Sequence, residues 1–379
     1  MAPRDVLKEG FAVKADPIVV IDLFSGAGGL SLGAARAGLE VVAAVETDPH
    51  AAACHALNFP RVKHVDVSVA DLTGRDIRKL ADNKPFALIG GPPCQGFSRI
   101  GRRDPKDERN SLFSHFFRLV RESAPEFYVA ENVPGILDHD FAPLRELALE
   151  QVSTYHNLSP QRLIASDFGA PTKRERVFFI GFRAQPKHLD VVSLAKRGAR
   201  DVVVQDALAG LPEKVDPNWQ SEVQSWRKVG HYTDLDFHRA AWGQIPAGVG
   251  SELGIRRLKQ HSLVSGCFGT RHSEDVVRRF NRTEAGTTEP ISRAYRLDPA
   301  GVCPTLRAGT DRTRGSFQAL RPIHPRQDRM ITPREAARLQ GFPDWFVFSP
   351  TKWHSFRQIG NSVSPLLSKR LLGAIRELV

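Results

Sequence analysis

Short apolar runs alternate with helix-like segments through the first third of the chain, and this alternation constrains the fold more than any other feature. Five runs are expected to form strands: Ile18–Leu23, Val41–Val45, Val62–Asp66, Phe86–Ile89 and Phe127–Ala130. Continuous apolar runs separated by helices are typical of parallel strands joined by crossover connections. We therefore predict an α/β fold built on a doubly wound parallel sheet.

The pattern changes beyond the fifth run. Leu163–Ala165 and Val177–Ile180 flank a turn that contains Gly and Pro, which favours an antiparallel pair of strands. A helix is expected at Pro333–Gln340, because Thr332 can cap it and proline is well tolerated in a first helical turn. A final amphipathic helix is predicted at Pro365–Leu378.

The length of the chain favours two unequal domains. At 379 residues it exceeds the size at which a single hydrophobic core usually stops growing. The larger domain is predicted to span residues 1–182 and to be completed by residues 357–379. Residues 183–320 show little periodicity and are expected to form a smaller, loop-rich domain, with residues 321–356 as a connecting segment.

The charge of the chain suggests a polyanionic partner, although a solvated surface would also carry such charge. The net charge is +11, and the excess lies entirely in the second part. Residues 1–181 contain 22 Lys and Arg against 23 Asp and Glu, whereas residues 182–379 contain 31 against 19. Nucleic acid is the usual partner of such a basic surface.

Other features of the composition indicate an ordinary globular protein in the cytoplasm. No apolar run has the length of a membrane span, and the first residues lack the apolar stretch of a signal peptide. The four cysteines, Cys54, Cys94, Cys267 and Cys303, form no CxxC pair, which argues against a zinc site or a disulfide framework. We expect no metal.

A glycine-rich loop follows the first predicted strand. It begins at Phe24 and contains Gly26, Gly28 and Gly29, and Glu46 lies twenty positions after Gly26. Such a loop lets the backbone approach a nucleotide-like ligand, and an acidic residue at this distance can bind ribose hydroxyls. The pattern alone fits NAD, FAD or S-adenosylmethionine, and a glycine turn used only for helix packing is the alternative.

Polar or reactive residues fall repeatedly at the carboxyl ends of the predicted strands, where doubly wound sheets bind ligands. They are Phe24, Glu46, Asp66, Cys94 and Glu131. Cys94 lies in the rigid loop GGPPCQGFS, and the basic cluster Arg99–Arg109 follows it. A thiol near a carboxylate suggests nucleophilic attack on a ring with acid and base assistance. A buried, inert cysteine and a salt-bridged glutamate are the alternatives.

Several ordered motifs make the chain resemble the C5-cytosine DNA methyltransferase family. The resemblance covers about residues 17–182 and 321–371. The motifs, in the order typical of the family, are DLFSGAGGLSLG, the acidic Glu46, GGPPCQGFS, ENV, DFGAPTKRERVFFIG, TPREAARLQGFPDWF and RQIGNSVSP. The resemblance implies a Rossmann-like, S-adenosylmethionine-dependent methyltransferase fold.

The resemblance also implies roles for individual residues. Cys94 matches the nucleophile, Glu131 the substrate-protonating glutamate and Arg176 an arginine that binds cytosine, while Arg174 is a nearby basic position of the same motif. Thr172 is a departure, because many members have Gln there. The positions that match contacts to S-adenosylmethionine are Phe24, Gly26, Gly29, Glu46, Asp66, Val67, Pro93, Asn361 and Val363.

The substrate implied by the resemblance is double-stranded DNA, in which one cytosine flips out of the stack. Residues 183–320 would then be the target-recognition domain, and Arg99–Arg109 a loop that closes over the base. Such enzymes occur in restriction-modification systems, so a cognate restriction endonuclease is a candidate partner, but whether the enzyme is solitary or paired with one cannot be read from the sequence. The target sequence cannot be read from the chain.

Three other functions remain open from the sequence. A tRNA cytosine methyltransferase would need the same Cys94 and Glu131, although the long basic segment 183–320 favours a DNA reader. A non-catalytic DNA-binding protein is disfavoured by the intact Cys94, Glu131 and Arg176. An NAD oxidoreductase would account for the glycine loop but for none of the motifs that follow it.

Overall fold

The computed structural model describes residues 17–93, 111–186, 190, 201–230, 237–239, 245–308 and 321–379. Its first half alternates strands and helices, as the sequence predicts. In chain order the main elements of this half are β1 (Val19–Leu23), α1 (Gly29–Arg36), β2 (Glu40–Val45), α2 (Pro49–Asn58), β3 (Lys63–Val65), α3 (Gly74–Leu80), β4 (Phe86–Gly90), α4 (Ser111–Ser123), β5 (Phe127–Asn132), α5 (Ala142–Glu150), β6 (His156–Asn157), β7 (Gln161–Ile164) and β8 (Glu175–Phe182).

One sheet organises this half. The strand order is β3-β2-β1-β4-β5-β8-β6, and β7 also pairs with β8. The pairs from β3 to β5 are parallel, which confirms the five predicted parallel strands. β8 is antiparallel to both β5 and β7, which confirms the predicted change of pattern. The chain adds β2 and β3 on one side of β1 and adds β4 and β5 on the other, so the order of strands switches between β1 and β4. Ligand binding is expected at such a switch point.

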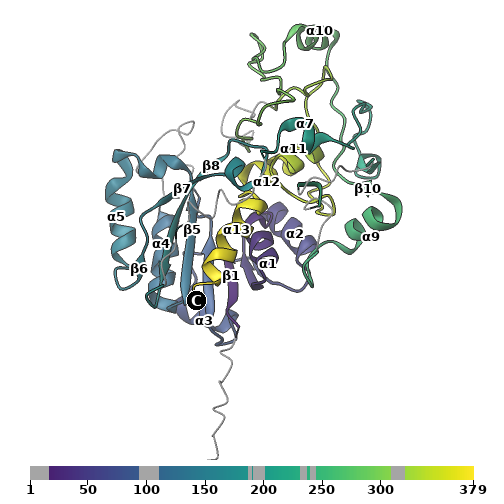
Figure 1. Cartoon of the computed structure of the whole chain (residues 1–379). Helices are drawn as coiled ribbons and strands as arrows, with labels where there is room; N and C mark the ends of the chain where they lie inside the picture. The colour runs from purple at the N-terminus through teal and green to yellow at the C-terminus, as the bar shows by residue number, and fades with distance from the viewer. Residues whose placement is uncertain are drawn as a thin grey trace, which may run out of the picture.

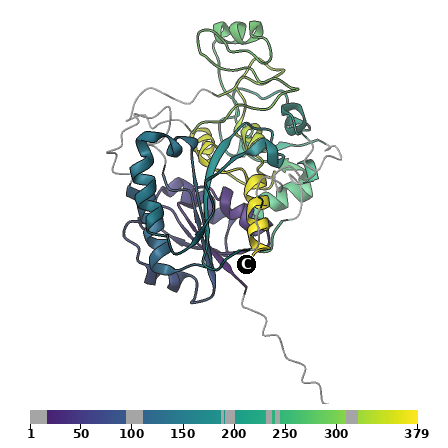
Figure 2. The same cartoon turned by 60° about the vertical axis from the view of Figure 1, so that its left-hand side comes forward.

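Helices cover both faces of the sheet, as Figure 2 shows. Alternation along β1 sends Ile21 into the core under α3 and α4, whereas Val20 packs with Leu30 of α1 and Leu371 of α13 (Pro365–Arg376). Figure 1 shows α1 and α13 side by side although they come from opposite ends of the chain. The C-terminal helix therefore completes the same layer as α1.

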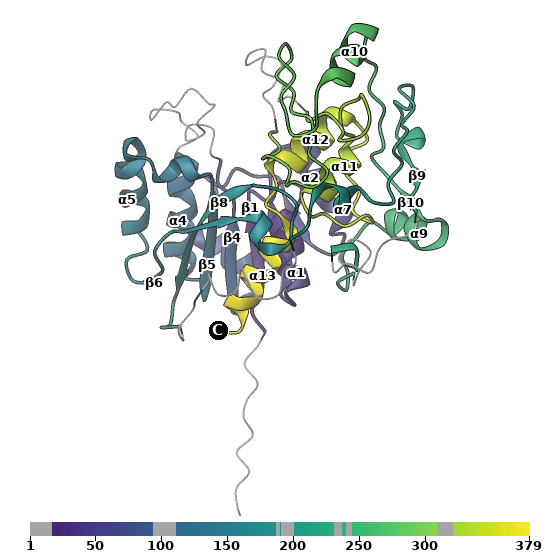
Figure 3. The same ribbon diagram turned by 45° about the horizontal axis from the view of Figure 1, so that its top comes forward.

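The second half contains short helices connected mainly by loops. Its elements are α7 (Val204–Leu208), β9 (Arg227–Lys228), α9 (Glu252–His261), β10 (Leu263–Val264), α10 (Glu274–Arg282), α11 (Pro333–Leu339) and α12 (Lys352–Asn361). In Figures 1 and 3 this half lies beyond α1 and α2, and α10 is at its far end. The helices predicted after Thr332 and at the C-terminus are confirmed as α11 and α13.

A second hydrophobic cluster joins the two halves. Trp345 and Phe346 pack in it with Leu32 of α1 and Phe59, which follows α2. Every residue from 331 to 349 is buried. The segment that the sequence suggested as a connection is therefore also the core between the halves.

Candidate active site

The glycine loop after β1 lies at the switch point of the sheet. Phe24 has φ +57°, a left-handed conformation that is uncommon for an aromatic residue and is often found at functional sites. Gly28 has φ +98° and immediately precedes α1. The loop is therefore a sharply turned backbone segment of the kind that can approach a ligand closely.

Glu46 at the end of β2 holds this loop. Its Oε2 accepts a hydrogen bond from the Gly26 amide at 2.9 Å, and its Oε1 accepts one from the Asp48 amide at 2.8 Å. Burial raises the pKa of Glu46, while these amide donors act in the opposite direction. A carboxylate has more acceptor positions than the two used here, so it can also accept from ribose hydroxyls.

The C-terminal segment closes the other side of the loop. A Cβ atom on Gly29 would lie 2.3 Å from the carbonyl oxygen of Val363, so only glycine allows this approach. The Ser368 hydroxyl donates to the Gly29 carbonyl at 2.9 Å. Asn361, at the end of α12, is exposed. The structure thus brings four of the predicted cofactor positions, Gly26, Glu46, Gly29 and Val363, into two contacting pairs.

Asp66 and Val67 follow β3 at the same edge of the sheet. Both are exposed, and Val67 keeps 39% of its surface accessible. An exposed apolar side chain at this edge of the sheet suits contact with a flat ring.

Glu131 and Arg176 form an ion pair where β5 meets β8. Arg176 Nε lies 2.6 Å from Glu131 Oε1, and both side chains are nearly buried. The antiparallel register that pairs Glu131 with Phe178 and Asn132 with Val177 sets this meeting. In a site with little water, such a charge-assisted contact fixes the orientation of the carboxylate.

The loop after β4 packs against the same glutamate. A Cβ atom on Gly91 would lie 2.9 Å from Glu131 Oε2, and Asn132 donates to the carbonyl of Pro92 at 3.3 Å. Pro93 is the last residue described before the gap, so Cys94 and the basic cluster Arg99–Arg109 lie outside the described residues. The chain enters the Cys94 segment from a loop that touches Glu131.

The three described cysteines, Cys54, Cys267 and Cys303, are buried. Burial raises the pKa of all three thiols, and that of Cys267 reaches about 12. The thiolate is the nucleophilic form of cysteine, so these three side chains are poor nucleophiles.

Arg174 and Thr172 support a neighbouring segment. Arg174 is almost completely buried, and its Nη1 donates to the carbonyl of Leu306 at 3.2 Å. Thr172 is fully buried and forms a bridge with Cys303, and its hydroxyl has no hydrogen-bond partner among the described residues. Of the two predicted arginines, Arg176 contacts Glu131, and Arg174 contacts the segment around residue 306.

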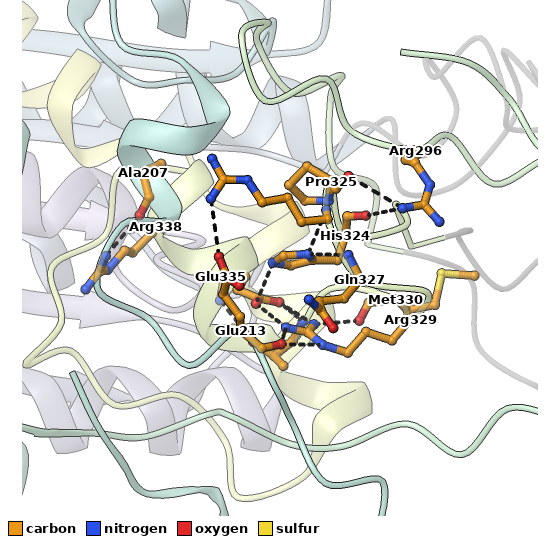
Figure 4. Close-up of polar contacts among 12 residues, drawn as sticks. Ala207, Glu213, Arg296, His324, Pro325, Gln327, Arg329, Met330, Glu335 and Arg338 are labelled. Atoms are coloured by element: carbon orange, nitrogen blue, oxygen red, sulfur yellow. Dashed lines mark hydrogen bonds and ion pairs between the residues drawn. The ribbon is translucent and has the colours of Figure 1, made fainter. Parts of the chain in front are cut away.

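Helix α11 connects several loops of the second half through buried charges. Figure 4 shows Glu335 between His324 and Arg329, and Arg329 Nη1 and Nη2 lie 2.9 and 2.7 Å from the Glu335 carboxylate oxygens. The Arg329 guanidinium also donates to the carbonyl of Glu213. Burial opposes ionisation of Glu335, but Arg329 outweighs it, and the pKa of Glu335 stays below its ordinary value.

Two further arginines of α11 are buried. Arg334 donates to the carbonyl of Ser265 and to that of Phe346, both at 2.7 Å. Arg338 forms a bidentate pair with Asp344 and donates to the carbonyl of Ala207. One short helix therefore positions loops from distant parts of the second half.

The sequence reasoning missed these buried charges and one more polar group, Asp22 in β1. A lone acid inside the apolar run IVVIDLF was a usable signal, because a buried carboxylate needs a hydrogen-bond partner. Its partner is Ser31, whose hydroxyl lies 2.6 Å from Asp22 Oδ2. No local pattern identifies the partners of Arg334 and Arg338, which are distant in sequence or lie in loops.

Two kinds of feature are absent from the described residues. No helix in these ranges has both the length and the apolar character needed to span a bilayer. No group of three or more His, Cys, Asp or Glu side chains in the same ranges is arranged to hold a metal ion.

Comparison with known proteins decides to which family the chain belongs. The family model described as C-5 cytosine-specific DNA methylase matches residues 18–377. The chain belongs to this family. It is therefore an enzyme of the DNA (cytosine-5-)-methyltransferase class, and members of this class act on a base flipped out of the duplex.

Two curated relatives are Type II methyltransferases. The chain is 40% identical over 366 residues to M.XorII of Xanthomonas oryzae pv. oryzae, and the match covers 94% of this chain and 84% of that protein. It is 31% identical over 387 residues to M.DdeI of Desulfomicrobium norvegicum, covering 93% and 87%. The similarity therefore extends through the second half and is not limited to the catalytic motifs.

Solved structures agree with this assignment. A prophage-encoded E. coli protein described as a DNA modification methyltransferase superposes with a TM-score of 0.86 at 48% identity, covering 95% of this chain and 99% of that one. The S. pombe Dnmt2 methyltransferase superposes with a TM-score of 0.63 at 18% identity, covering 95% and 98%. The second likeness shows the fold alone.

Proposed function

We propose that the enzyme methylates one cytosine within a specific duplex DNA sequence, using Cys94 as nucleophile and S-adenosylmethionine as donor. The observation that carries the proposal is the Glu131–Arg176 pair, which packs against the loop leading to Cys94 and lies one strand away from the glycine loop. Type II methyltransferases act on DNA within restriction-modification systems, so a cognate endonuclease is a proposed partner. The bacterial cytoplasm or nucleoid is the proposed location, because the substrate lies there.

The residues at the carboxyl edge fit the donor. Phe24, Gly26 and Gly29 supply a backbone turn, Glu46 supplies carboxylate oxygens beside it, and Val67 supplies an exposed apolar surface. We assign the same role to Asp66, Pro93, Asn361 and Val363. When bound, S-adenosylmethionine supplies a methyl group on a positively charged sulfur.

The residues of this chain would activate the base. The Cys94 thiolate forms a bond to C6 of the flipped cytosine while Glu131 gives a proton to N3, and C5 becomes nucleophilic enough to accept the methyl group. Loss of the C5 proton to a base then restores the ring double bond, breaks the S–C6 bond and frees the thiolate, and the N3 proton returns to Glu131. Arg176 orients Glu131 and can donate to the cytosine, and Arg174 supports this region from the loop around residue 306.

We infer a role for each domain. We assign catalysis and donor binding to residues 1–182 with 357–379, and target recognition to residues 183–320. Residues 321–356 connect the two, and the buried arginines of α11 support this role because they contact loops of the second half.

Bisulfite sequencing of DNA from cells that express the protein tests the proposal. We expect one sequence context to be protected at cytosine, and we expect Glu131→Gln to lose most of that protection while the protein still accumulates. Labelled donor incubated with duplex DNA and with total tRNA provides the second arm. Label in tRNA alone, or protection that does not depend on Glu131, would overturn the assignment.

A further inference from the structure

A chain of four polar side chains runs beneath the glycine loop, outside the residues assigned to chemistry. The Ser31 hydroxyl lies 2.6 Å from Asp22 Oδ2, His55 Nε2 lies 3.0 Å from Ser31 Oγ, and His64 Nε2 lies 2.8 Å from His55 Nδ1. The four residues come from β1, α1, α2 and β3. Asp22, Ser31 and His55 are fully buried, and His64 is half-buried. We call these four residues the relay.

The hydrogen bonds of the relay run in one direction when Asp22 is ionised. Burial raises the pKa of Asp22 to about 7, so this condition is met above that pH. Asp22 then accepts from Ser31, which commits the single hydroxyl proton, so Ser31 Oγ can only accept from His55. His55 must then carry its proton on Nε2 and accept at Nδ1 from the Nε2–H of His64. Burial, together with the neighbouring His64, lowers the pKa of His55 to about 3, which keeps the ring neutral as this pattern requires.

His55 also forms the floor of the glycine loop. A Cβ atom on Gly28 would lie 3.0 Å from His55 Cδ2 and 2.5 Å from Phe59 Cε2, so the loop backbone rests on these two stacked rings. At the other end of the relay, His64 is followed by Val65, whose carbonyl accepts from the Glu46 amide at 3.2 Å. The relay therefore links the loop that begins at Phe24 to the end of β3.

We propose that His55 is a positioning residue for the methyl donor, acting through Ser31 and Asp22 to fix the glycine loop relative to Asp66 and Val67. The inference rests on the proposed donor site. The relay connects two segments of that site, the glycine loop and the end of β3 that leads to Asp66 and Val67. Its value to the enzyme is preorganisation, because a loop already ordered before binding loses less conformational freedom when the donor arrives.

Calorimetric titration with S-adenosylmethionine provides the first test. His55→Phe keeps a ring that can stack on Phe59 and support Gly28, but it removes both hydrogen bonds, and Ser31→Ala removes the central link with little change in volume. We expect each variant to bind the donor about fivefold to tenfold more weakly, the range expected for one lost buried hydrogen bond. The double variant should be no weaker than the single variants, because the relay acts as one unit.

Asn58→Ala is the matched control. Asn58 lies on the same helix and is equally buried. Its side-chain amide donates hydrogen bonds to the carbonyls of Cys54 and Val347, and not to the glycine loop. It should lower the melting temperature while leaving donor affinity unchanged. Affinity for the target duplex without donor should be unchanged in His55→Phe.

Histidine-selective ¹⁵N NMR provides a readout independent of donor binding. At a pH well above 7, where Asp22 is ionised, the wild-type protein should show His55 as a neutral Nε2–H tautomer. In Ser31→Ala the signal of a strongly hydrogen-bonded His55 Nε2 proton should be lost. An Nδ1–H tautomer, an unchanged donor affinity in His55→Phe, or an equal loss of affinity in Asn58→Ala would each overturn the inference. A wild-type protein that binds no donor would instead overturn the proposed function.

Discussion

Replacing Arg338 by Met should destabilise the protein more than any exposed charge change. Arg338 and Asp344 are both fully buried in their side chains, and two hydrogen bonds of 2.9 and 2.7 Å join them. Arg338 Nη1 also donates to the carbonyls of Ala207 and Ala209. The variant would leave Asp344 as a buried charge whose remaining arginine neighbour, Arg334, lies 3.8 Å away.

Breaking one side of a buried ion pair typically costs about 3–5 kcal/mol, and we expect the free energy of unfolding to fall by about 3 kcal/mol because Arg334 remains. Urea unfolding monitored by tryptophan fluorescence measures this loss of stability. Trp345 follows Asp344 directly and lies in the hydrophobic cluster that joins the two halves, so its fluorescence should report unfolding there. Arg326→Ala is the control, because its pair with Glu213 is more than half exposed and should contribute less than about 1 kcal/mol.

Arg338→Met should affect the binding of DNA and the binding of S-adenosylmethionine differently. The loops that Arg338 holds belong to the second half, so affinity for target DNA should fall while donor affinity stays the same. Arg338→Met combined with Asp344→Leu should recover part of the lost stability, because the buried Asp344 carboxylate is removed together with its partner while Arg334 keeps its hydrogen bonds to the carbonyls of Ser265 and Phe346. A loss no larger than that of Arg326→Ala would refute the assignment of α11 as the support of these loops.

Three further predictions concern the donor, the acid response and DNA. Glu46→Ala should weaken S-adenosylmethionine binding about tenfold in calorimetry, as expected for lost hydrogen bonds to a charged group. The circular dichroism spectrum should stay the same, and an unchanged affinity would remove Glu46 from the site. Burial lowers the pKa of His324 from 6.5 to about 4, so the unfolded chain binds a proton that the folded chain does not, and stability should fall as the pH drops from about 6.5 to about 4. His324→Gln should remove up to about 3 kcal/mol of this dependence in acid titrations of unfolding, and an unaltered pH profile would contradict it. The excess positive charge of residues 182–379 should make DNA affinity fall steeply with salt in fluorescence anisotropy, and an affinity insensitive to salt would argue against phosphate contacts.

The sequence predicts the sheet well because each parallel strand is a short run buried on both faces. The run from Ile18 to Leu23 contains β1, and the one acid within it, Asp22, is accommodated in the buried strand with a hydrogen bond from the Ser31 hydroxyl to its Oδ2. The helices α9 and α10 were not predicted. Each has only a short apolar face, formed by Ile255 and Leu258 in α9 and by Val276 and Phe280 in α10. Two residues at helical spacing in a strongly charged segment make too short a repeat to predict a helix.

The site is predictable only in part, for a related reason. Glu46 directly follows β2 and Glu131 lies at the end of β5, so strand prediction alone places them at one edge of the sheet. Contacts between distant segments are different. The approach of Gly29 to Val363 depends on how α13 packs on α1, and the Arg338–Asp344 pair depends on a turn after α11. Neither leaves a periodic signal in the sequence.

The central claim is that Cys94 forms a covalent bond to C6 of the target cytosine. Fluorine at C5 cannot leave as a proton does, so it should block the step that frees the thiolate. Duplex DNA with 5-fluorocytosine at the target, mixed with enzyme and S-adenosylmethionine, should give an adduct that survives denaturing electrophoresis. Cys94→Ala should give none, whereas Cys267→Ala, which changes a buried thiol of raised pKa, should still give it. An enzyme that methylates ordinary DNA but never forms the adduct, or a Cys94→Ala variant with full activity, would contradict the covalent mechanism and favour methylation of the exocyclic amino group.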